Sequence, residues 1–166
     1  MTFTVRSART SDVPAIQALI EPLVQRRILL GKDRVVFYES LQEFRVAEDD
    51  TGRLIGCGAL HLIWEDLAEV RTLAVEEAWL RKGVGHALLE RIEQDARALG
   101  VTKLFCLTFE TGFFGRHGFE PIGEEIVSPD VFAQLALSPD EGVAEFLDLA
   151  RVKPNTLGNT RMLKHL

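Results

Sequence analysis

The sequence predicts an α/β protein whose central sheet is mixed, mostly antiparallel and flanked by helices. Residues 69–75 alternate with the period of two that a strand requires, and residues 84–99 carry apolar side chains at helical spacing. Because this helix separates two strands, the next strand, at 101–109, is expected to pair in parallel with the first. Two apolar runs, at residues 44–48 and 54–64, enclose a turn rich in Asp and Gly, which predicts an antiparallel hairpin.

Caps and apolar spacing predict the other elements. Thr10-Ser11-Asp12 offers cap residues, and Pro14 sits in the first turn of the helix that follows. Gly100 suits the end of the long helix. Whether residues 143–150 form a helix or a strand is left open. The further expected elements are a first strand at 3–6, a helix at 37–44, a short helix at 111–117, a strand at 119–127, helix starts at Ser128-Pro129-Asp130 and Ser138-Pro139-Asp140, and a last edge strand at 160–166.

Length and composition favour one domain with a substantial core. The chain has 166 residues, of which 46% are hydrophobic. We expect a single domain over residues 1–166, with a core at about residues 3–127 and a C-terminal extension on the substrate side at about residues 128–166.

The charge balance and the cysteines narrow the class of protein. A net charge of −6 argues against nucleic acid or an anionic membrane as the main partner. The chain has no apolar run of transmembrane length and no signal-peptide pattern at its start, so we expect a cytoplasmic location. Cys57 and Cys106 lie in apolar strand-like runs and are interpreted as small buried hydrophobes in a reducing compartment, not as a disulfide. The four histidines are scattered, which predicts no metal site.

A glycine-spaced segment, Arg81-Lys82-Gly83-Val84-Gly85-His86, joins the central strand to the long helix. N–H groups at the start of a helix point outward at the positive end of its dipole, which makes a phosphate site. Glycines let phosphates approach the backbone closely. The segment lacks the third glycine of a dinucleotide fingerprint and the Gly-Lys-Ser/Thr of a nucleotide loop. An ordinary tight turn is the alternative interpretation.

The order of strand, Leu-Ala-Val, acidic turn, basic-Gly-x-Gly and amphipathic helix resembles the pyrophosphate-binding core of the GNAT acyl-CoA N-acetyltransferases. The resemblance implies the GNAT fold and acetyl-CoA as co-substrate, with the pyrophosphate on the loop and the thioester along the preceding strand. Leu80 departs from the family, which often has Arg or Gln at that position. The cofactor-binding residues implied are Leu73, Ala74, Val75, Arg81, Lys82, Gly83, Val84, Gly85, His86 and Phe114.

Acetyl transfer to an amine needs a base for the ammonium proton and a proton donor for the departing thiolate. In the GNAT architecture the central strand parts from the next one and the acetyl group lies in the gap, so Glu69 is the candidate base. It could instead pair with Arg71 or with a cross-strand cation. The usual family Tyr is replaced by Phe114, which cannot donate a proton, so Thr108 is the candidate that assists the leaving thiol. A locally bonded strand residue is the alternative for Thr108.

Three segments together resemble the short, single-domain N-acetylglutamate synthases: AEVRTLAV, LFCLTFETGFFGRHGF and the tail AEFLDLARVKPNTLGNTRML. The resemblance implies transfer of acetyl to the α-amine of L-glutamate, the first step of arginine biosynthesis, with L-glutamine as a second substrate. It also implies Glu69 as the base, Thr108 as the assisting hydroxyl and a substrate-holding basic loop at residues 31–34.

Several cations and amides are candidates to hold the two carboxylates of an acidic amino acid, because arginine can donate two parallel hydrogen bonds and lysine acts as a point charge. The alternative is that each cation pairs with one of the 25 acidic side chains on the surface. The predicted substrate-binding residues are Lys32, Arg34, Arg71, Lys153, Asn155, Asn159 and Arg161.

Two other functions stay open from the sequence. One is a GNAT acetyltransferase for another small amine or for a protein N-terminus. The other is a catalytically silent acetyl-CoA-binding regulatory module, which the Phe114 and Leu80 departures favour. A homodimer is left open as the assembly.

Overall fold

A computed structural model of the chain describes residues 2–123, 127–148 and 157–166. Lys153 and Asn155, two of the predicted substrate residues, lie outside the described residues. The chain divides into two compact units, each of which is described by itself. Unit 1 comprises Met1–His61 and Val70–Gly100, and unit 2 comprises Leu62–Glu69 and Val101–Leu166.

The predicted mixed α/β sheet is confirmed, with the strand order β1-β2-β3-β4-β5-β7-β6. The pairs β1–β2, β2–β3, β5–β7 and β6–β7 are antiparallel, and β4–β5 is parallel as predicted from the intervening helix. The strands are β1 (Phe3–Ser7), β2 (Phe44–Asp49), β3 (Leu54–Trp64), β4 (Leu67–Val75), β5 (Lys103–Thr108), β6 (Glu120–Pro121) and β7 (Thr160–His165). The helices are α1 (Val13–Gln25), α2 (Arg34–Glu39), α3 (Val84–Ala98), α4 (Thr111–Arg116), α5 (Pro129–Leu135) and α6 (Glu141–Phe146), with 3-10 turns η1 (Thr10–Asp12), η2 (Leu41–Glu43) and η3 (Glu77–Trp79).

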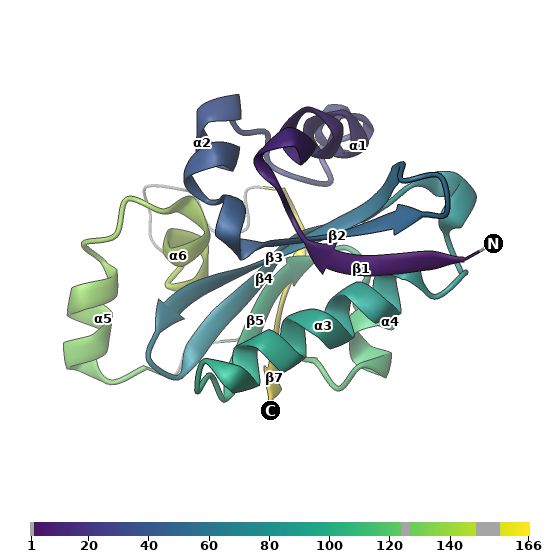
Figure 1. Cartoon of the computed structure of the whole chain (residues 1–166). Helices are drawn as coiled ribbons and strands as arrows, with labels where there is room; N and C mark the ends of the chain where they lie inside the picture. The colour runs from purple at the N-terminus through teal and green to yellow at the C-terminus, as the bar shows by residue number, and fades with distance from the viewer. Residues whose placement is uncertain (1, 124–126, 149–156) are drawn as a thin grey trace. The chain divides into compact units, whose positions relative to one another are not determined.

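Within unit 1, helices cover both faces of the strands, α1 and α2 on one side and α3 on the other (Figure 1). Val46 packs in the cluster formed with α1 and α2, whereas the next residue, Ala47, packs with Val84 and Leu88 of α3. This is the alternation expected of a strand that is buried on both faces. The register from β2 to β3 skips Ile55, so this extra residue joins Gly56 on the α3 face and the alternation resumes at Cys57.

The glycines of β3 determine how closely α3 can approach the sheet. A Cβ atom at Gly56 would lie 2.9 Å from Cγ1 of Val84, and one at Gly58 would lie 2.9 Å from Cδ1 of Ile92. A side chain at either position would therefore force the neighbouring side chains of α3 to shift. Because α3 begins at Val84, inside the glycine-spaced segment, the packing of α3 on the sheet also determines where that segment lies in unit 1.

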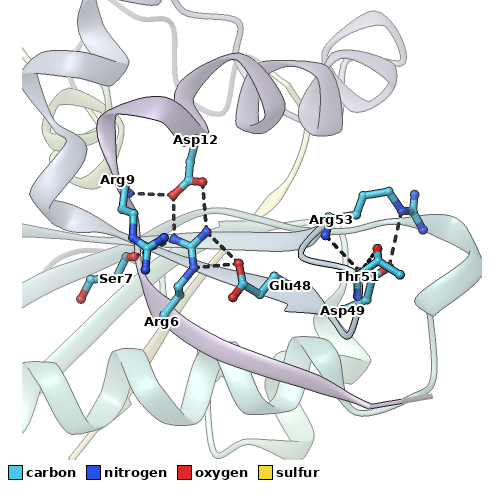
Figure 2. A network of polar contacts seen from close by, with 8 residues as sticks. All are labelled: Arg6, Ser7, Arg9, Asp12, Glu48, Asp49, Thr51 and Arg53. Carbon is cyan, nitrogen blue, oxygen red and sulfur yellow. Dashed lines mark hydrogen bonds and ion pairs between the residues drawn. The ribbon is translucent and has the colours of Figure 1, made fainter.

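A partly buried ion pair ties the start of α1 to the first strand of unit 1. Figure 2 shows the Arg6 guanidinium between two carboxylates: Nη1 of Arg6 lies 2.7 Å from Oδ2 of Asp12, and Nε lies 2.8 Å from Oε2 of Glu48. The Asp12 carboxylate also accepts the Arg9 N–H at 2.7 Å. The Arg6 hydrogen bond lowers the pKa of Asp12 and outweighs the opposing effect of its burial. Asp12, the N-cap residue of α1, therefore has a structural role: it holds the start of α1 against β1.

Unit 2 has a separate core between its strands and the two C-terminal helices. Phe105 of β5 and Phe146 of α6 are fully buried and meet edge to face, with ring centroids 5.0 Å apart. Leu67, Leu135 and Leu147 complete the same cluster. The region predicted as a substrate-side extension therefore packs on the strand that follows the long helix.

Several element boundaries differ from the predictions. The second helix, expected at 37–44, is α2 at Arg34–Glu39 followed by η2, because Phe44 already starts β2. Of the strand expected at 119–127, the described residues show β6, Glu120–Pro121, and residues 124–126 lie outside the described residues. The undecided segment at 143–150 is helical up to Phe146. The strand at the end of the chain forms as predicted but is not an edge: β7 lies between β5 and β6.

The two Ser-Pro-Asp motifs of the tail are both near helix starts, but they work differently. Ser128 caps α5 as predicted, accepting the N–H of Val131. At the second motif the cap is Asp140, not Ser138: Oδ1 of Asp140 accepts the N–H of Val143 at 3.0 Å. Ser138 instead accepts the N–H of Asp140, so α6 begins two residues later than the sequence suggests.

Candidate functional site

The glycine-spaced segment forms an exposed loop that ends at the first turn of α3, within unit 1. Gly83 is the N-cap residue and has a φ of +86°, a backbone conformation that favours glycine. The first bond of the helix runs from the Ala87 N–H to the Gly83 carbonyl at 3.0 Å. The N–H groups of Val84, Gly85 and His86 therefore precede the helical ladder and point outward at the positive end of α3. This geometry fits a pyrophosphate.

The side of the loop that precedes Gly83 is anchored by a buried tryptophan. Trp79 is 4% exposed and meets Phe3 of β1 edge to face. The Lys82 ammonium lies 5.5 Å from the centre of the Trp79 ring and donates to the Ala78 carbonyl at 2.7 Å. Arg81 has a φ of +63°, unfavourable for a side chain with a Cβ. The backbone of the loop is therefore held in a defined shape, which a site made of main-chain donors requires.

The strand before the loop, β4, carries a feature that the sequence prediction missed. Thr72 has a φ of +56°, an outlier for a β-branched residue. Its carbonyl accepts a hydrogen bond from the Cys57 thiol at 3.4 Å. Full burial raises the pKa of Cys57 to about 12, so the thiol stays protonated and available as this donor. The irregularity lies directly before Leu73, Ala74 and Val75, the three residues implied to hold the thioester.

Glu69 and Thr108 both belong to unit 2, where the register places them on opposite faces of the strands. Glu69 pairs with Phe105 in the parallel ladder, and directly opposite residues share a face. Glu69 is therefore on the face of Phe105, which the α6 cluster covers, and Thr108 points to the other face because it lies three residues further along β5. Both side chains are buried: Glu69 is 5% exposed and Thr108 is 7% exposed.

The local bonds of Thr108 leave its proton available. Its Oγ1 accepts the N–H of Glu110 at 2.8 Å, and a hydroxyl has one proton to donate in addition to its acceptor lone pairs. The nearby Cys106 is not a candidate nucleophile. Burial, and next the carboxylate of Glu69, raise the pKa of the Cys106 thiol far above its ordinary range. The carboxylate of Glu69 therefore acts electrostatically on Cys106, a buried residue of β5.

The predicted acceptor residues fall into both units, and the structure shows partners for some of them. In unit 1, Nε of Arg34 donates to Oε1 of Gln17 of α1 at 2.6 Å. Lys32 and Arg71 are partly buried. In unit 2, Asn159 is 7% exposed, and Arg161 of β7 donates to two main-chain carbonyls. Their contact with an amino acid stays a prediction.

The Phe114 ring is a core residue of unit 2. It is 5% exposed and meets Phe113 and Phe119 edge to face, each with centroids 5.1 Å apart. The structure therefore shows Phe114 as a packing residue, and its contact with a cofactor stays a prediction.

The described part of the chain has neither a metal-binding group nor a membrane-spanning helix. No group of three or more His, Cys, Asp or Glu side chains is arranged to hold a metal ion among these residues. Among the same residues, no helix is long and apolar enough to cross a membrane.

Comparison with known proteins identifies the family. Residues 18–119 match the Acetyltransferase (GNAT) family. A curated relative, the amino-acid acetyltransferase of Mycobacterium tuberculosis, is 54% identical over 161 residues, which cover 96% of this chain and 92% of the relative. The chain belongs to the GNAT acetyltransferase family, and acetyl-CoA is accordingly its co-substrate.

Solved structures extend the likeness to three dimensions. A protein from Mycobacterium tuberculosis, solved in complex with CoA and NLQ, has a TM-score of 0.93 at 53% identity, covering 98% of this chain and 99% of that one. N-acetylglutamate synthase from Neisseria gonorrhoeae, solved with coenzyme A and N-acetyl-glutamate, has a TM-score of 0.77 at 28% identity. That match covers all of this chain but 35% of the longer synthase.

Proposed function

We propose that this protein transfers the acetyl group of acetyl-CoA to the α-amine of L-glutamate, with L-glutamine as a second acceptor, and so catalyses the first step of arginine biosynthesis. The observation that carries the proposal is the 54% identity to an amino-acid acetyltransferase over 96% of the chain. This span includes the C-terminal tail, which goes beyond the 18–119 match to the general family. The N-acetyl-glutamate in the complex of the Neisseria gonorrhoeae synthase supports glutamate as the acceptor.

The co-substrate supplies an activated acetyl group, and the loop of unit 1 is proposed to hold its pyrophosphate. The N–H groups of Val84, Gly85 and His86 donate to phosphate oxygens, and the residues Leu73, Ala74 and Val75 of β4 provide the strand edge for the thioester arm. Arg81 and Lys82 add positive charge at the mouth of the loop.

Glu69 is proposed as the general base. A carboxylate takes the proton from the substrate ammonium, directly or through a water molecule, which leaves the lone pair of the amine free to attack the thioester carbonyl. The C–N bond then forms, the C–S bond breaks, and the products are the N-acetyl amino acid and coenzyme A. The burial of Glu69 supports this role, because it keeps bulk water away from the proposed place of proton transfer.

Thr108 is proposed to donate a hydrogen bond to the departing thiolate. Its Oγ1 lone pair is engaged by the Glu110 N–H, so the hydroxyl proton is directed elsewhere.

The cations Lys32, Arg34 and Arg71 of unit 1 are proposed to bind carboxylates of the acceptor. Asn159 of unit 2 is proposed separately as a further hydrogen-bond donor to the acceptor. Lys153 and Asn155, from the part of the tail outside the described residues, stay in the same proposal. Acidic acceptors are favoured over cationic amines by such a set, because a like charge in the acceptor side chain would be repelled.

A coenzyme A release assay with a panel of amino acids tests the proposed function. Purified protein should release coenzyme A from acetyl-CoA with glutamate and glutamine, and mass spectrometry should find acetyl on the α-amine. Activity that prefers lysine or a peptide N-terminus would contradict the acidic acceptor. Binding of acetyl-CoA without turnover on any amine would favour the silent regulatory module instead.

A further inference from the structure

The guanidinium of Arg161 is engaged by main chain from two separate segments of unit 2. Its Nη1 donates to the Gly123 carbonyl at 2.8 Å, just after β6, and its Nη2 donates to the Phe146 carbonyl at the end of α6. Its Nε is buried and has no hydrogen-bond partner among the described residues. The side chain therefore links β7, the strand that carries it, to the end of α6 and to the segment after β6, where the N–H of Ile122 also donates to the Arg161 carbonyl.

These contacts lie on the face of the strands that carries Glu69. Arg161 is opposite Leu107 in the antiparallel ladder, and Leu107 shares a face with Phe105 because the two are two residues apart. Phe105 is opposite Glu69. The Phe146 ring packs on Phe105, so the residue whose carbonyl Arg161 holds also covers the partner of the proposed base.

We propose that Arg161 is a positioning residue, which fixes the end of α6 and the segment after β6 so that Phe146 forms the wall beside Glu69. This inference rests on the proposed function, in which Glu69 is the base. In this inference the Arg161 guanidinium binds two carbonyls of the protein, whereas the sequence predicted that it binds a carboxylate of the acceptor. A planar fork with five N–H donors can bridge two carbonyls in different directions, whereas a lysine ammonium on a flexible stem cannot hold both at the same angles.

The two uses of Arg161 predict different responses to substitution. A carboxylate-binding arginine acts directly on the acceptor, so Arg161→Lys should keep part of the charge interaction, and the loss should appear in the KM of the acceptor and depend on which carboxylates the acceptor has. A bridging arginine acts through geometry, so Arg161→Lys should lose about as much as Arg161→Gln, and the loss should be the same for every acceptor. Displacing a group beside the reacting atoms by about 1 Å can cost about 10²-fold in rate.

The test measures kcat and KM for glutamate, glutamine and acetyl-CoA in wild type, Arg161→Lys, Arg161→Gln and Arg161→Ala. We expect both conservative variants to lower kcat by about 10- to 100-fold. The KM for acetyl-CoA should stay unchanged, and the ratio of glutamate to glutamine activity should match that of wild type. Added guanidinium, but not methylammonium, should restore activity to Arg161→Ala, because only the planar cation can bridge the two carbonyls.

Phe146→Leu is a second test of the inference. It replaces the ring proposed to lie beside Glu69 with a smaller side chain and keeps the main-chain carbonyl that Arg161 binds. It should lower kcat with the KM for acetyl-CoA unchanged. Arg97→Gln, at an exposed position of α3, is the matched control that removes a cation elsewhere. Retention of most activity by Arg161→Lys, or a loss confined to glutamate, would overturn the inference. If wild type uses a different amino acid, the proposed function fails, and the same variants assayed with that amino acid still decide the role of Arg161.

Discussion

The loop at the start of α3 and the residues around Glu69 are two halves of one proposed reaction, but they are built from different materials. The loop in unit 1 is made of backbone: a positive-φ glycine, the outward N–H groups of the first helical turn and a buried tryptophan beneath them. The Glu69 region in unit 2 is made of side chains from β4, β5, α6 and β7. Several of these side chains are buried, among them Glu69, Phe105 and Phe146. A backbone site tolerates changes of side chain that do not fill it, whereas a side-chain site depends on each residue.

Replacement of the proposed base should give the largest effect. Glu69→Gln keeps the shape of the side chain and removes its proton acceptor, so kcat should fall by about 10²- to 10⁴-fold. The low-pH limb of the rate profile should flatten in the same variant. Steady-state kinetics across pH 5 to 9 check both. A kcat close to that of wild type would show that Glu69 is structural. The residues around it would then no longer be assigned to proton transfer.

Lys32→Ala should weaken the acceptor rather than the co-substrate. Loss of a desolvated partner of a carboxylate costs about 2–5 kcal/mol in binding, so the KM for glutamate should rise by about 30-fold or more. The KM for acetyl-CoA should not follow. Arg26→Ala removes an exposed cation just after α1 and serves as the control. Equal small effects of Lys32→Ala and Arg26→Ala would remove Lys32 from the acceptor residues.

Asp12→Asn should affect folding and leave both halves of the site alone. Removing one member of a fully buried ion pair costs about 3–5 kcal/mol. Because this pair is partly exposed and Arg6 keeps Glu48 as a partner, we expect a loss of about 1–3 kcal/mol in the free energy of unfolding. Urea unfolding at pH 7 measures it. The pKa of Asp12 is lowered in the folded protein, so its contribution is present above the ordinary value of about 3.9 and is lost as pH falls below that value. The difference between wild type and variant should therefore shrink below about pH 4, and a difference that is constant with pH would contradict the ion-pair explanation.

Thr108→Val should give the smallest catalytic effect. One hydrogen bond has a net worth of about 0.5–1.5 kcal/mol, so kcat should fall by about 2- to 10-fold. The loss should disappear with a thioester whose thiol is more acidic and needs no assistance in leaving. A change confined to KM would show that the hydroxyl does not act on the thiolate.

The sequence predicts the fold and the position of the glycine-spaced segment between β4 and α3, both of which the structure confirms, and cofactor binding by that segment stays a prediction. The period-two run before the glycine loop and the helical spacing after it identify β4 and α3, and the Asp-Gly turn identifies the hairpin of β2 and β3, because these signals are local. The start of α6 was predicted two residues too early, because local signals do not separate two possible caps. Ser138 and Asp140 both suit a helix N-cap, and the contacts of the folded chain decide between them.

The side-chain half could be predicted only in part. Glu69 and Thr108 could be named from a family resemblance, but their burial and their opposite faces depend on the pairing of β5 with β4 and β7, which no local pattern encodes. The carbonyl partners of Arg161 come from Gly123 and Phe146, residues far away along the chain, so nothing near Arg161 predicts them. The left-handed conformation of Thr72 likewise has no sequence signal, since threonine is unfavourable there.

The most direct test of this division is calorimetric binding of acetyl-CoA to wild type, Gly85→Val and Glu69→Gln, with turnover measured on the same samples. Valine at position 85 adds bulk where the phosphate approaches the first turn of α3. Loss of anion contacts worth up to about 2 kcal/mol should raise the Kd by about 3- to 30-fold, while kcat at saturating acetyl-CoA is largely kept. Glu69→Gln should bind acetyl-CoA as wild type does and fail to turn it over. Unchanged binding in Gly85→Val, or weakened acetyl-CoA binding in Glu69→Gln, would contradict the assignment of cofactor binding to the backbone loop and of chemistry to the side chains.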